Sequence, residues 1–409
     1  MKVLLLSFTM QTDVFPLGLA YIQSYAQAFH PDIEFQRKEF LLSSRASYET
    51  NKNTELAALS YILLEKPDLI AFSCYIWNAN ATQEFAHTIK TILPNTKILI
   101  GGVEITKEML TEDIDFAVQG EGEIALKELL DFLKGERKIE DVHNLITKST
   151  ENKQIYIQDL DSIPFPYLTK EKQEYKVIRM ETSRGCAFNC SFCHYAQPPL
   201  RFFSLEYIKK GVDILFEKYT FSYLTFLDAN FNAKKERMFA ILDYIEEKSK
   251  GKKIPIHVEL RPELIDADMA QRLRKYAFPI SCELGLQSTD AEVLKAVNRP
   301  TDLKKVQEAL KALEENKVHY KIDLMYGLPK DNFYKFLSSV RFILRNTTQK
   351  KIVAHHFMQL NNTTEKETTR IKKTQSSMVM ETGTQNILQL HLTKLFLDQL
   401  NEELKIRTK

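Results

Sequence analysis

Three of the five cysteines in this chain fall in one short segment, ETSRGCAFNCSFCHY, which begins at Glu181. Cys186, Cys190 and Cys193 have the spacing C-x3-C-x2-C directly after a stretch with the composition of a strand. Three thiolates on one loop can converge on a single inorganic centre. A structural zinc site normally has four protein ligands, and only His194 is near enough to be the fourth. An iron-sulfur cube held by four cysteines lacks its fourth cysteine here. The spacing therefore favours a 4Fe-4S cluster with one open iron, and a zinc site or incidental thiols are the alternatives.

The cysteine spacing, with the aromatic Phe192 before the last cysteine, resembles the signature of radical S-adenosylmethionine (radical SAM) enzymes. The resemblance implies that the open iron chelates the amino and carboxylate groups of S-adenosylmethionine. It also implies that one electron from the cluster breaks a C–S bond to give a 5′-deoxyadenosyl radical. The cofactors supply the reactivity in such enzymes, and the protein orients the reactants. The implied partners are a small-molecule or peptide substrate and an electron donor of the flavodoxin or ferredoxin type.

Six runs with strand composition lie between Tyr175 and Leu360, and a helical segment follows each run but the last. These runs cover residues 175–183, 223–230, 254–260, 278–288, 318–329 and 352–360. Six such steps fall short of the eight of a complete TIM barrel, so the sequence predicts a partial (β/α)6 TIM-type barrel over 176–360. The functional loops of such barrels lie at the carboxyl ends of the strands.

Polar side chains interrupt four of these strands at corresponding ends. By the resemblance, such positions hold the ribose hydroxyls and the methionine carboxylate of S-adenosylmethionine. The predicted cofactor-binding residues are Asp228, Asn230, Glu259, Arg261, Gln287, Ser288 and Gly327, and the same ends carry Glu283, Asp323 and Tyr326. The alternative for each one is a capping or solvated side chain. Cys74 and Cys282 are expected to be packed thiols.

The first 145 residues alternate apolar strands with amphipathic helices. Expected strands are 2–7, 32–40, 68–75, 97–102 and 115–120, with helices such as 17–29 and 81–93 between them. Near-continuous apolar strands separated by helices predict a doubly wound (Rossmann-like) parallel sheet, whose ligands lie beyond the carboxyl ends of the strands.

A doubly wound domain ahead of a radical SAM core resembles the cobalamin-binding class of these enzymes. Three strings carry this resemblance: CYIWNAN from Cys74, GGVEIT from Gly101 and QGEGE from Gln119. The predicted cobalamin-binding residues are Trp77, Gly101, Gly102, Gly120, Glu121 and Gly122. Glycine lets the backbone approach a ligand closely. The alternative is that these glycines form tight turns, and that 120–123 begins a helix with its acids at the positive end.

One departure concerns the ligand of cobalt. Many cobalamin domains place a histidine in D-x-H-x-x-G after the first strand, and here Phe15 takes that place within Asp13–Gly18. Imidazole ligation from this loop is therefore excluded. Cobalamin-dependent radical enzymes often lack this histidine. Phe15 and Trp77 either cover the corrin or belong to the core.

The remaining segments and the charge complete the domain prediction. Residues 146–175, with Pro164 and Pro166, are expected to form a linker. Residues 361–409 are expected to form a polar tether, mobile over 361–377, and an amphipathic helix.

A net charge of +2 argues against nucleic-acid binding, and no apolar run reaches the about 18 residues of a membrane span. The chain has an odd number of cysteines, five, and three of them are clustered, which is no disulfide framework and indicates a reducing, cytoplasmic compartment.

Together these features predict a cobalamin-dependent radical SAM enzyme, most directly a methyltransferase acting on an unactivated carbon. Two alternatives stay open. One is a radical rearrangement, ring contraction or oxidation without methyl transfer. The other is a binding protein whose catalytic machinery has decayed.

Overall fold

The computed structural model describes residues 1–11, 13–42, 48–167, 172–348, 351–358, 360–363, 370–374, 377–381 and 387–406. The chain divides into two compact units. The first comprises Met1–Gln173 with Leu360–Asn362, and the second comprises Glu174–Gln359 with Thr363–Lys409. The segment predicted as a linker thus groups with the first unit up to Gln173.

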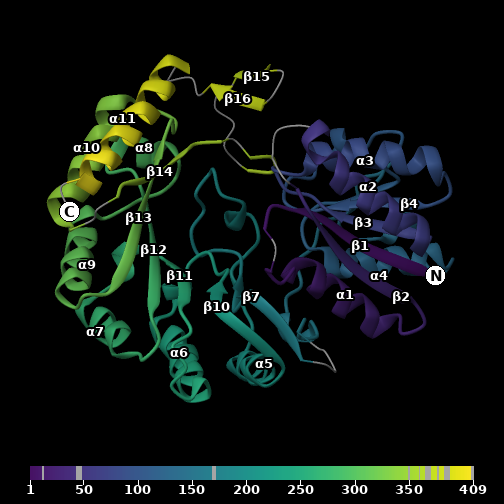
Figure 1. Cartoon of the computed structure of the whole chain (residues 1–409), viewed down its shortest axis with the longest axis horizontal. Helices are drawn as coiled ribbons and strands as arrows, with labels where there is room; N and C mark the ends of the chain where they lie inside the picture. Colours follow the sequence, from purple (N-terminus) through teal and green to yellow (C-terminus); the bar gives the residue numbers. More distant parts are fainter. Residues whose placement is uncertain are drawn as a thin grey trace. The chain divides into compact units, whose positions relative to one another are not determined.

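The first unit is built on a sheet with the order β2-β1-β3-β4-β5-β6. Its strands are β1 (Lys2–Thr9), β2 (Glu34–Leu41), β3 (Leu69–Ser73), β4 (Lys97–Gly101), β5 (Phe116–Val118) and β6 (Leu145–Ile146). All neighbours are parallel except β6, which runs antiparallel to β5. The helices are α1 (Leu17–Phe29), α2 (Tyr48–Glu65), α3 (Ala79–Ile92) and α4 (Gly122–Leu133). Helices α1 and α4 cover one face of the sheet, and α2 and α3 cover the other (Figure 1).

The continuous apolar run of β1 explains this double cover. Successive side chains of a strand point to opposite faces. Leu4 and Leu6 join the core that contains Ile62 of α2, whereas Val3 and Leu5 join the core with α1 and α4. The doubly wound sheet predicted from the sequence is confirmed.

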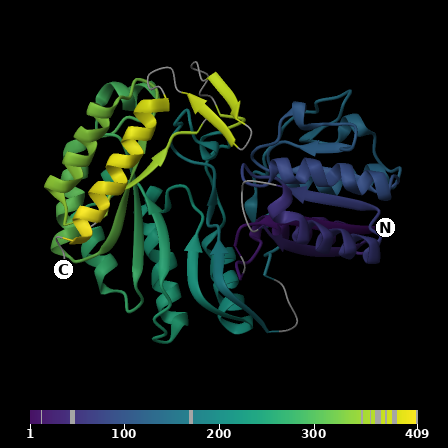
Figure 2. The ribbon, with the colours of Figure 1, turned by 45° about the horizontal axis from the view of Figure 1, so that its top comes forward.

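The second unit is a curled parallel half-barrel with the strand order β14-β13-β12-β11-β10-β7 (Figure 2). Its strands are β7 (Gln173–Met180), β10 (Tyr219–Phe226), β11 (Ile256–Leu260), β12 (Ile280–Gln287), β13 (His319–Tyr326) and β14 (Val353–His356). The intervening helices are α5 (Leu205–Lys218), α6 (Lys235–Ser249), α7 (Ala267–Lys275), α8 (Ala291–Ala296), α9 (Leu303–Glu315) and α10 (Phe333–Asn346). The predicted six-stranded partial barrel is confirmed.

Five of these helices begin at a side chain that caps the first turn. In each, the side chain before the first turn accepts a hydrogen bond from a backbone N–H, which satisfies a donor that the helix leaves open. These capping residues are Ser204, Asp266, Asp290, Asp302 and Asn332. The starts of these helices are thereby fixed.

The chain ends in α11 (Ile387–Ile406), which packs on the half-barrel. Its Leu390 and Leu397 are buried, the rings of Phe396 and Phe333 meet edge to face, and the Asn401 side chain bonds both backbone groups of Ile352. Among the described residues, no helix has the length and apolarity needed to cross a membrane.

Part of the predicted tether has secondary structure, and its mobility stays a prediction. Strands β15 (Arg370–Thr374) and β16 (Ser377–Glu381) pair antiparallel, because main-chain hydrogen bonds do not require apolar side chains. Residues 364–369 and 375–376 of the tether lie outside the described part of the chain.

Candidate active site

The cysteine loop starts from a short hairpin, β8 (Ser183–Arg184) paired with β9 (Arg201–Phe202). Gly185 follows with φ of +80°, and a Cβ there would lie 2.4 Å from the carbonyl oxygen of Pro199. Only glycine fits this position without a shift of backbone. The hairpin and this turn carry the chain directly into Cys186.

Asp228, just after the end of β10, binds the residues that lead into the same loop. Its carboxylate accepts hydrogen bonds from the backbone N–H of Thr182 at 3.0 Å, the Thr182 hydroxyl at 2.7 Å and the Ser183 hydroxyl at 2.5 Å. The side chain is buried, and burial raises the pKa of Asp228 although these bonds lower it. The structure thus shows Asp228 bound to the chain itself. Its predicted role in binding S-adenosylmethionine stays a prediction.

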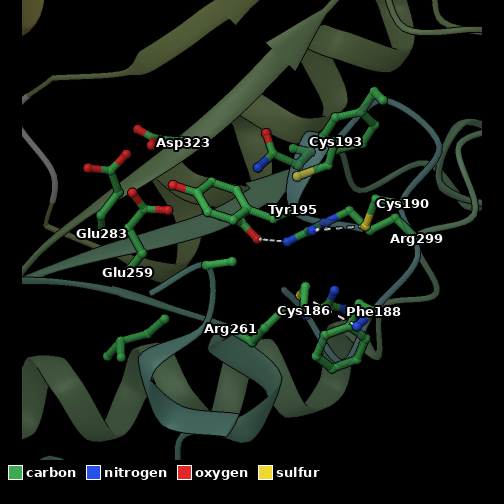
Figure 3. Close-up of a pocket in the computed structure, with 15 residues that line it drawn as sticks. Cys186, Phe188, Cys190, Cys193, Tyr195, Glu259, Arg261, Glu283, Arg299 and Asp323 are labelled. Carbon is green, nitrogen blue, oxygen red and sulfur yellow. Dashed lines mark hydrogen bonds between the residues drawn. The ribbon is translucent and has the colours of Figure 1, made fainter. Parts of the chain in front are cut away.

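Cys186, Cys190 and Cys193 line one pocket of about 160 Å³ (Figure 3). The Phe188 N–H donates to the sulfur of Cys186 at 3.4 Å, and Nη1 of Arg299 donates to the sulfur of Cys190 at 3.5 Å. Burial raises the pKa of Cys186, and it raises the pKa of Cys193 to about 11. These groups are thus thiols on their own at neutral pH, and binding of a metal centre would release their protons.

The set of side chains that line the pocket bears on which inorganic centre it can hold. Among the residues that the structure describes, no three His, Cys, Asp or Glu side chains stand close enough to hold a single metal ion. The three thiols nevertheless share one pocket wall. His194, which the sequence offers as a fourth zinc ligand, does not line this pocket, so the three thiols fit an iron-sulfur cluster with one open iron better than a four-ligand zinc site.

Arg299 reaches the cysteine loop because α8 is tied to that loop. After α8 ends, the Val297 carbonyl accepts from the Ser191 N–H at 3.1 Å, and the Asn298 side chain donates to the Asn189 carbonyl at 3.0 Å. Arg299 follows and also donates through Nη2 to the carbonyl of Gly285. Sequence reasoning missed Arg299, because it looked for polar residues at strand ends and this arginine follows a helix.

Arg261 is the second arginine of the pocket. Its guanidinium lies 3.8 Å from the ring centre of Phe188 and donates to Glu263 and to the carbonyl of Pro300. Nη1 of Arg261 and Nε of Arg299 are buried without a hydrogen-bond partner within the described chain. Two guanidinium groups with buried donors suit an anionic ligand such as a carboxylate.

Three carboxyl groups face the cysteines across the pocket (Figure 3). Glu259 of β11 pairs in register with Glu283 of β12, and Asp323 of β13 lies two pairs further along, opposite Gly285. Burial, and then repulsion from Glu283, raises the pKa of Glu259 to about 7. Burial and a hydrogen bond with Glu283 raise the pKa of Asp323 to about 8. Glu283 and Asp323 therefore titrate as a coupled pair that holds one proton at neutral pH.

Two basic groups decide which member of the coupled pair is charged. His257 lies 3.2 Å from Glu283, and Lys321 lies 2.5 Å from it. Although burial opposes them, hydrogen bonds from His257, Asp323 and Lys321 lower the pKa of Glu283. Glu283 is thus the carboxylate, Asp323 is the acid, and one oxygen of Asp323 has no hydrogen-bond partner in the described part of the chain.

The other predicted barrel residues occupy different positions. Gln287 lines the pocket. Asn230 is buried, and neither atom of its amide has a partner among the described residues. The Ser288 hydroxyl accepts from the Asp290 N–H at 3.2 Å, and Gly327, with φ of +81°, donates its N–H to Asp331. Cofactor roles for these residues, and for Glu259 and Arg261, stay predictions.

The glycines of the first unit pack closely against their own chain. A Cβ on Gly102 would lie 2.2 Å from the Cys74 carbonyl oxygen, and one on Gly120 would lie 2.5 Å from the Gln154 side chain. Gly101 ends β4, and Gly122 begins α4. Glu121 accepts a hydrogen bond from the Ile157 N–H at 2.8 Å. Tight turns and a helix start thus account for these backbone positions, and contact with cobalamin stays a prediction.

The carboxyl edge of this sheet also carries apolar side chains. Trp77 stacks on Tyr75 with ring centres 4.5 Å apart, and Ile76 and Val103 are about two-fifths exposed, at 40% and 43%. Half-buried aromatic rings and exposed aliphatic side chains beside glycine turns fit a corrin ring. Phe15, by contrast, is buried and stacks on Tyr167 at 4.0 Å, so it belongs to the core.

Comparison with known proteins identifies two domains in the chain. The B12 binding domain family matches residues 3–130, and the Radical SAM superfamily matches residues 180–343. An uncharacterized methyltransferase, PH0819, from Pyrococcus horikoshii is 25% identical over 346 residues, covering 80% of this chain and 72% of that protein. The cobalamin-dependent radical SAM methyltransferase TokK from Streptomyces tokunonensis is 25% identical over 310 residues. That match covers 68% of this chain but only 45% of TokK.

The fold recurs in a solved structure. The radical S-adenosylmethionine methyltransferase TsrM from Kitasatospora setae, determined with cobalamin and a 4Fe-4S cluster bound, superposes with a TM-score of 0.71. The superposition covers 89% of this chain and 73% of TsrM at 13% sequence identity. The likeness in fold thus extends across both units.

Proposed function

Because the chain belongs to the radical SAM proteins that carry a B12-binding domain, we propose that it is a cobalamin-dependent methyltransferase acting on an unactivated carbon. One observation carries this proposal. The three thiols of the C-x3-C-x2-C segment line the same pocket as two arginines and three strand-end carboxyl groups, in a chain whose first domain is a B12-binding domain. A binding protein with decayed machinery would have no need for this combination.

The residues divide into three groups by what they would hold. Cys186, Cys190 and Cys193 would hold the 4Fe-4S cluster. Arg261 and Arg299 offer buried donors for the carboxylate of S-adenosylmethionine. Glu259, Glu283 and Asp323 would face its ammonium and ribose groups, with Gln287 beside them. When bound, the cluster and S-adenosylmethionine supply radical chemistry, and cobalamin supplies the transfer of a methyl group.

The protonation states of the pocket suit these roles. Glu283 is a carboxylate that can attract a positive group, whereas the Asp323 proton can be donated to a hydroxyl or ether oxygen. Tyr195 also lines the pocket, and Figure 3 shows it between the carboxyl groups and the thiols.

The partners and the compartment are part of the proposal. The substrate is a small molecule or peptide, and electrons come from a donor of the flavodoxin or ferredoxin type. All five cysteines are free thiols in the structure, which suits a reducing, cytoplasmic compartment.

The cofactor content tests the proposal first. Protein purified without oxygen should contain about four irons, four sulfides and one cobalt per chain. Cys190→Ala should lose the iron, and the matched control Cys282→Ala should keep it, because Cys282 is fully buried and does not line the pocket. Equal iron loss in both variants would refute the cluster assignment.

The products test the reaction itself. A methyltransferase that uses one S-adenosylmethionine for the methyl group and another for the radical should form S-adenosylhomocysteine and 5′-deoxyadenosine in equal amounts. 5′-Deoxyadenosine alone, in cobalamin-loaded protein that converts its substrate, would instead establish a radical rearrangement or oxidation.

A further inference from the structure

Residues Leu360–Asn362 follow the last strand of the half-barrel in sequence, yet they group with the first unit. The Asn361 side chain donates to the Glu104 carbonyl at 3.1 Å. Asn362 has φ of +59°, a left-handed conformation that asparagine adopts more readily than most residues. This short segment is therefore held by specific contacts rather than by apolar burial.

The Asn362 side chain uses both ends of its amide. Its Nδ2 donates to the carbonyl of Ile105 at 2.7 Å and to that of Val103 at 3.2 Å. Its Oδ1 accepts from Nε2 of Gln119 at 2.7 Å. One asparagine thus joins two loops of the first unit that are separate in sequence.

These two loops carry five of the six predicted cobalamin residues, all except Trp77. Val103 directly follows Gly102, Ile105 lies two residues further along the same loop, and Gln119 directly precedes Gly120. The parallel ladder between β4 and β5 ends at the pair Gly101 and Val118. Beyond that pair no strand pairing joins the two loops, and the hydrogen bonds of the Asn362 amide connect them instead.

We propose that Asn362 is a positioning residue for cobalamin, which clamps the loop 101–106 to the loop 119–122 and so keeps the corrin-facing edge of the sheet in its binding conformation. The inference rests on the proposed function for the identity of the ligand. The clamp itself rests only on the hydrogen bonds of Asn362. A loop that is already ordered loses less conformational entropy when a ligand binds.

Three variants test the clamp. Asn362→Gly keeps the left-handed backbone but removes the amide. Asn362→Asp keeps the oxygen that Gln119 reaches, but it places a carboxylate oxygen against the carbonyls of Val103 and Ile105. Asn361→Gly is the matched control, since Asn361 is a neighbouring asparagine that bonds only one of the two loops.

Hydrogen exchange of the cobalamin-free protein is the first measurement. The amides of Ile105 and Gln119 are hydrogen-bonded, to Gly102 and Asn144, so their protection reports the order of each loop. Both amides should exchange at least ~10-fold faster in Asn362→Gly and faster still in Asn362→Asp. Unchanged protection in both variants would overturn the clamp.

Titration with hydroxocobalamin, followed by its visible absorption, is the second measurement. The Kd should rise about 10-fold in Asn362→Gly and more in Asn362→Asp, while Asn361→Gly stays within about twofold of wild type. The cluster absorption should be unchanged in all three variants. If Asn362→Gly binds hydroxocobalamin with the same Kd as wild type, the positioning role is refuted. A cluster-loaded wild type that takes up no cobalamin would refute the proposed function instead.

Discussion

Replacing Asp228 should release the cysteine loop from the half-barrel. The carboxyl group receives three hydrogen bonds from Thr182 and Ser183, the residues that lead into the loop, and it is buried with 1% exposed. Each such bond contributes about 1 kcal/mol net, so Asp228→Ala should lower the free energy of unfolding by about 3 kcal/mol. Asp228→Asn keeps one acceptor oxygen and can donate to the hydroxyls, so its loss should be about 1 kcal/mol.

Urea unfolding followed by circular dichroism measures the free-energy change, and iron content after reconstitution measures the consequence for the cluster. Asp228→Ala should hold less iron than Asp228→Asn, which should hold less than wild type. The matched control is Asp213→Ala. Asp213 lies on α5, its side chain is 43% exposed, and it bonds Lys248 and Tyr244, so its removal should cost less than about 1 kcal/mol.

The urea midpoints and iron contents of these variants test whether Asp228 anchors the loop. If Asp228→Ala unfolds at the same urea concentration as Asp213→Ala and binds a full complement of iron, Asp228 does not anchor the loop. If Asp228→Ala is stable but fails to bind S-adenosylmethionine, Asp228 binds the cofactor directly, as the sequence predicts.

Three further predictions concern the pocket and the first unit. Arg299→Gln should shift the reduction potential of the cluster by about 40 mV to more negative values, because the hydrogen bond from Arg299 to Cys190 stabilises the reduced, more negatively charged cluster and the variant lacks it. An unchanged potential in spectroelectrochemistry would contradict this prediction. Glu259 has its pKa raised by burial from 4.5 to about 7, so the folded state holds an extra proton between these values and stability should fall as the pH rises from 4.5 to 7. Glu259→Gln should flatten that decline in urea midpoints, and an equally steep decline would exclude Glu259 as its source. Bound Co(II) cobalamin should show no splitting by an axial protein nitrogen in its electron paramagnetic resonance spectrum, because Phe15 has no lone pair and packs on Tyr167; a nitrogen-split spectrum would refute this prediction.

Local patterns were sufficient for the fold and for the inorganic centre. Apolar runs such as that of β1 report burial on both faces, and a parallel doubly wound sheet follows from their alternation with helices. The segment with Cys186, Cys190 and Cys193 lies within eight residues, so its spacing alone brings the thiols to one loop. The polar ends of β11 and β12 were also readable, because every strand of a parallel half-barrel ends at the same edge.

Sequence patterns were not sufficient where a contact joins distant residues. Arg299 reaches Cys190 only because the end of α8 binds the cysteine loop, and Asn362 joins two loops more than 240 positions earlier in the chain. The charge states of Glu283 and Asp323 likewise depend on His257 and Lys321, which neighbouring strands bring beside them.

The sequence by itself thus determined the two domains, the class of fold and the three thiols, because each rests on periodicity or spacing within a short window. Only the tertiary structure decided that Asp228 is bound to the cysteine loop, that Phe15 is part of the core and that Asn362 links the loops of the first sheet. Such contacts depend on how strands and helices far apart in sequence are packed together, and a side chain does not encode in its own neighbourhood which partner the fold will bring to it.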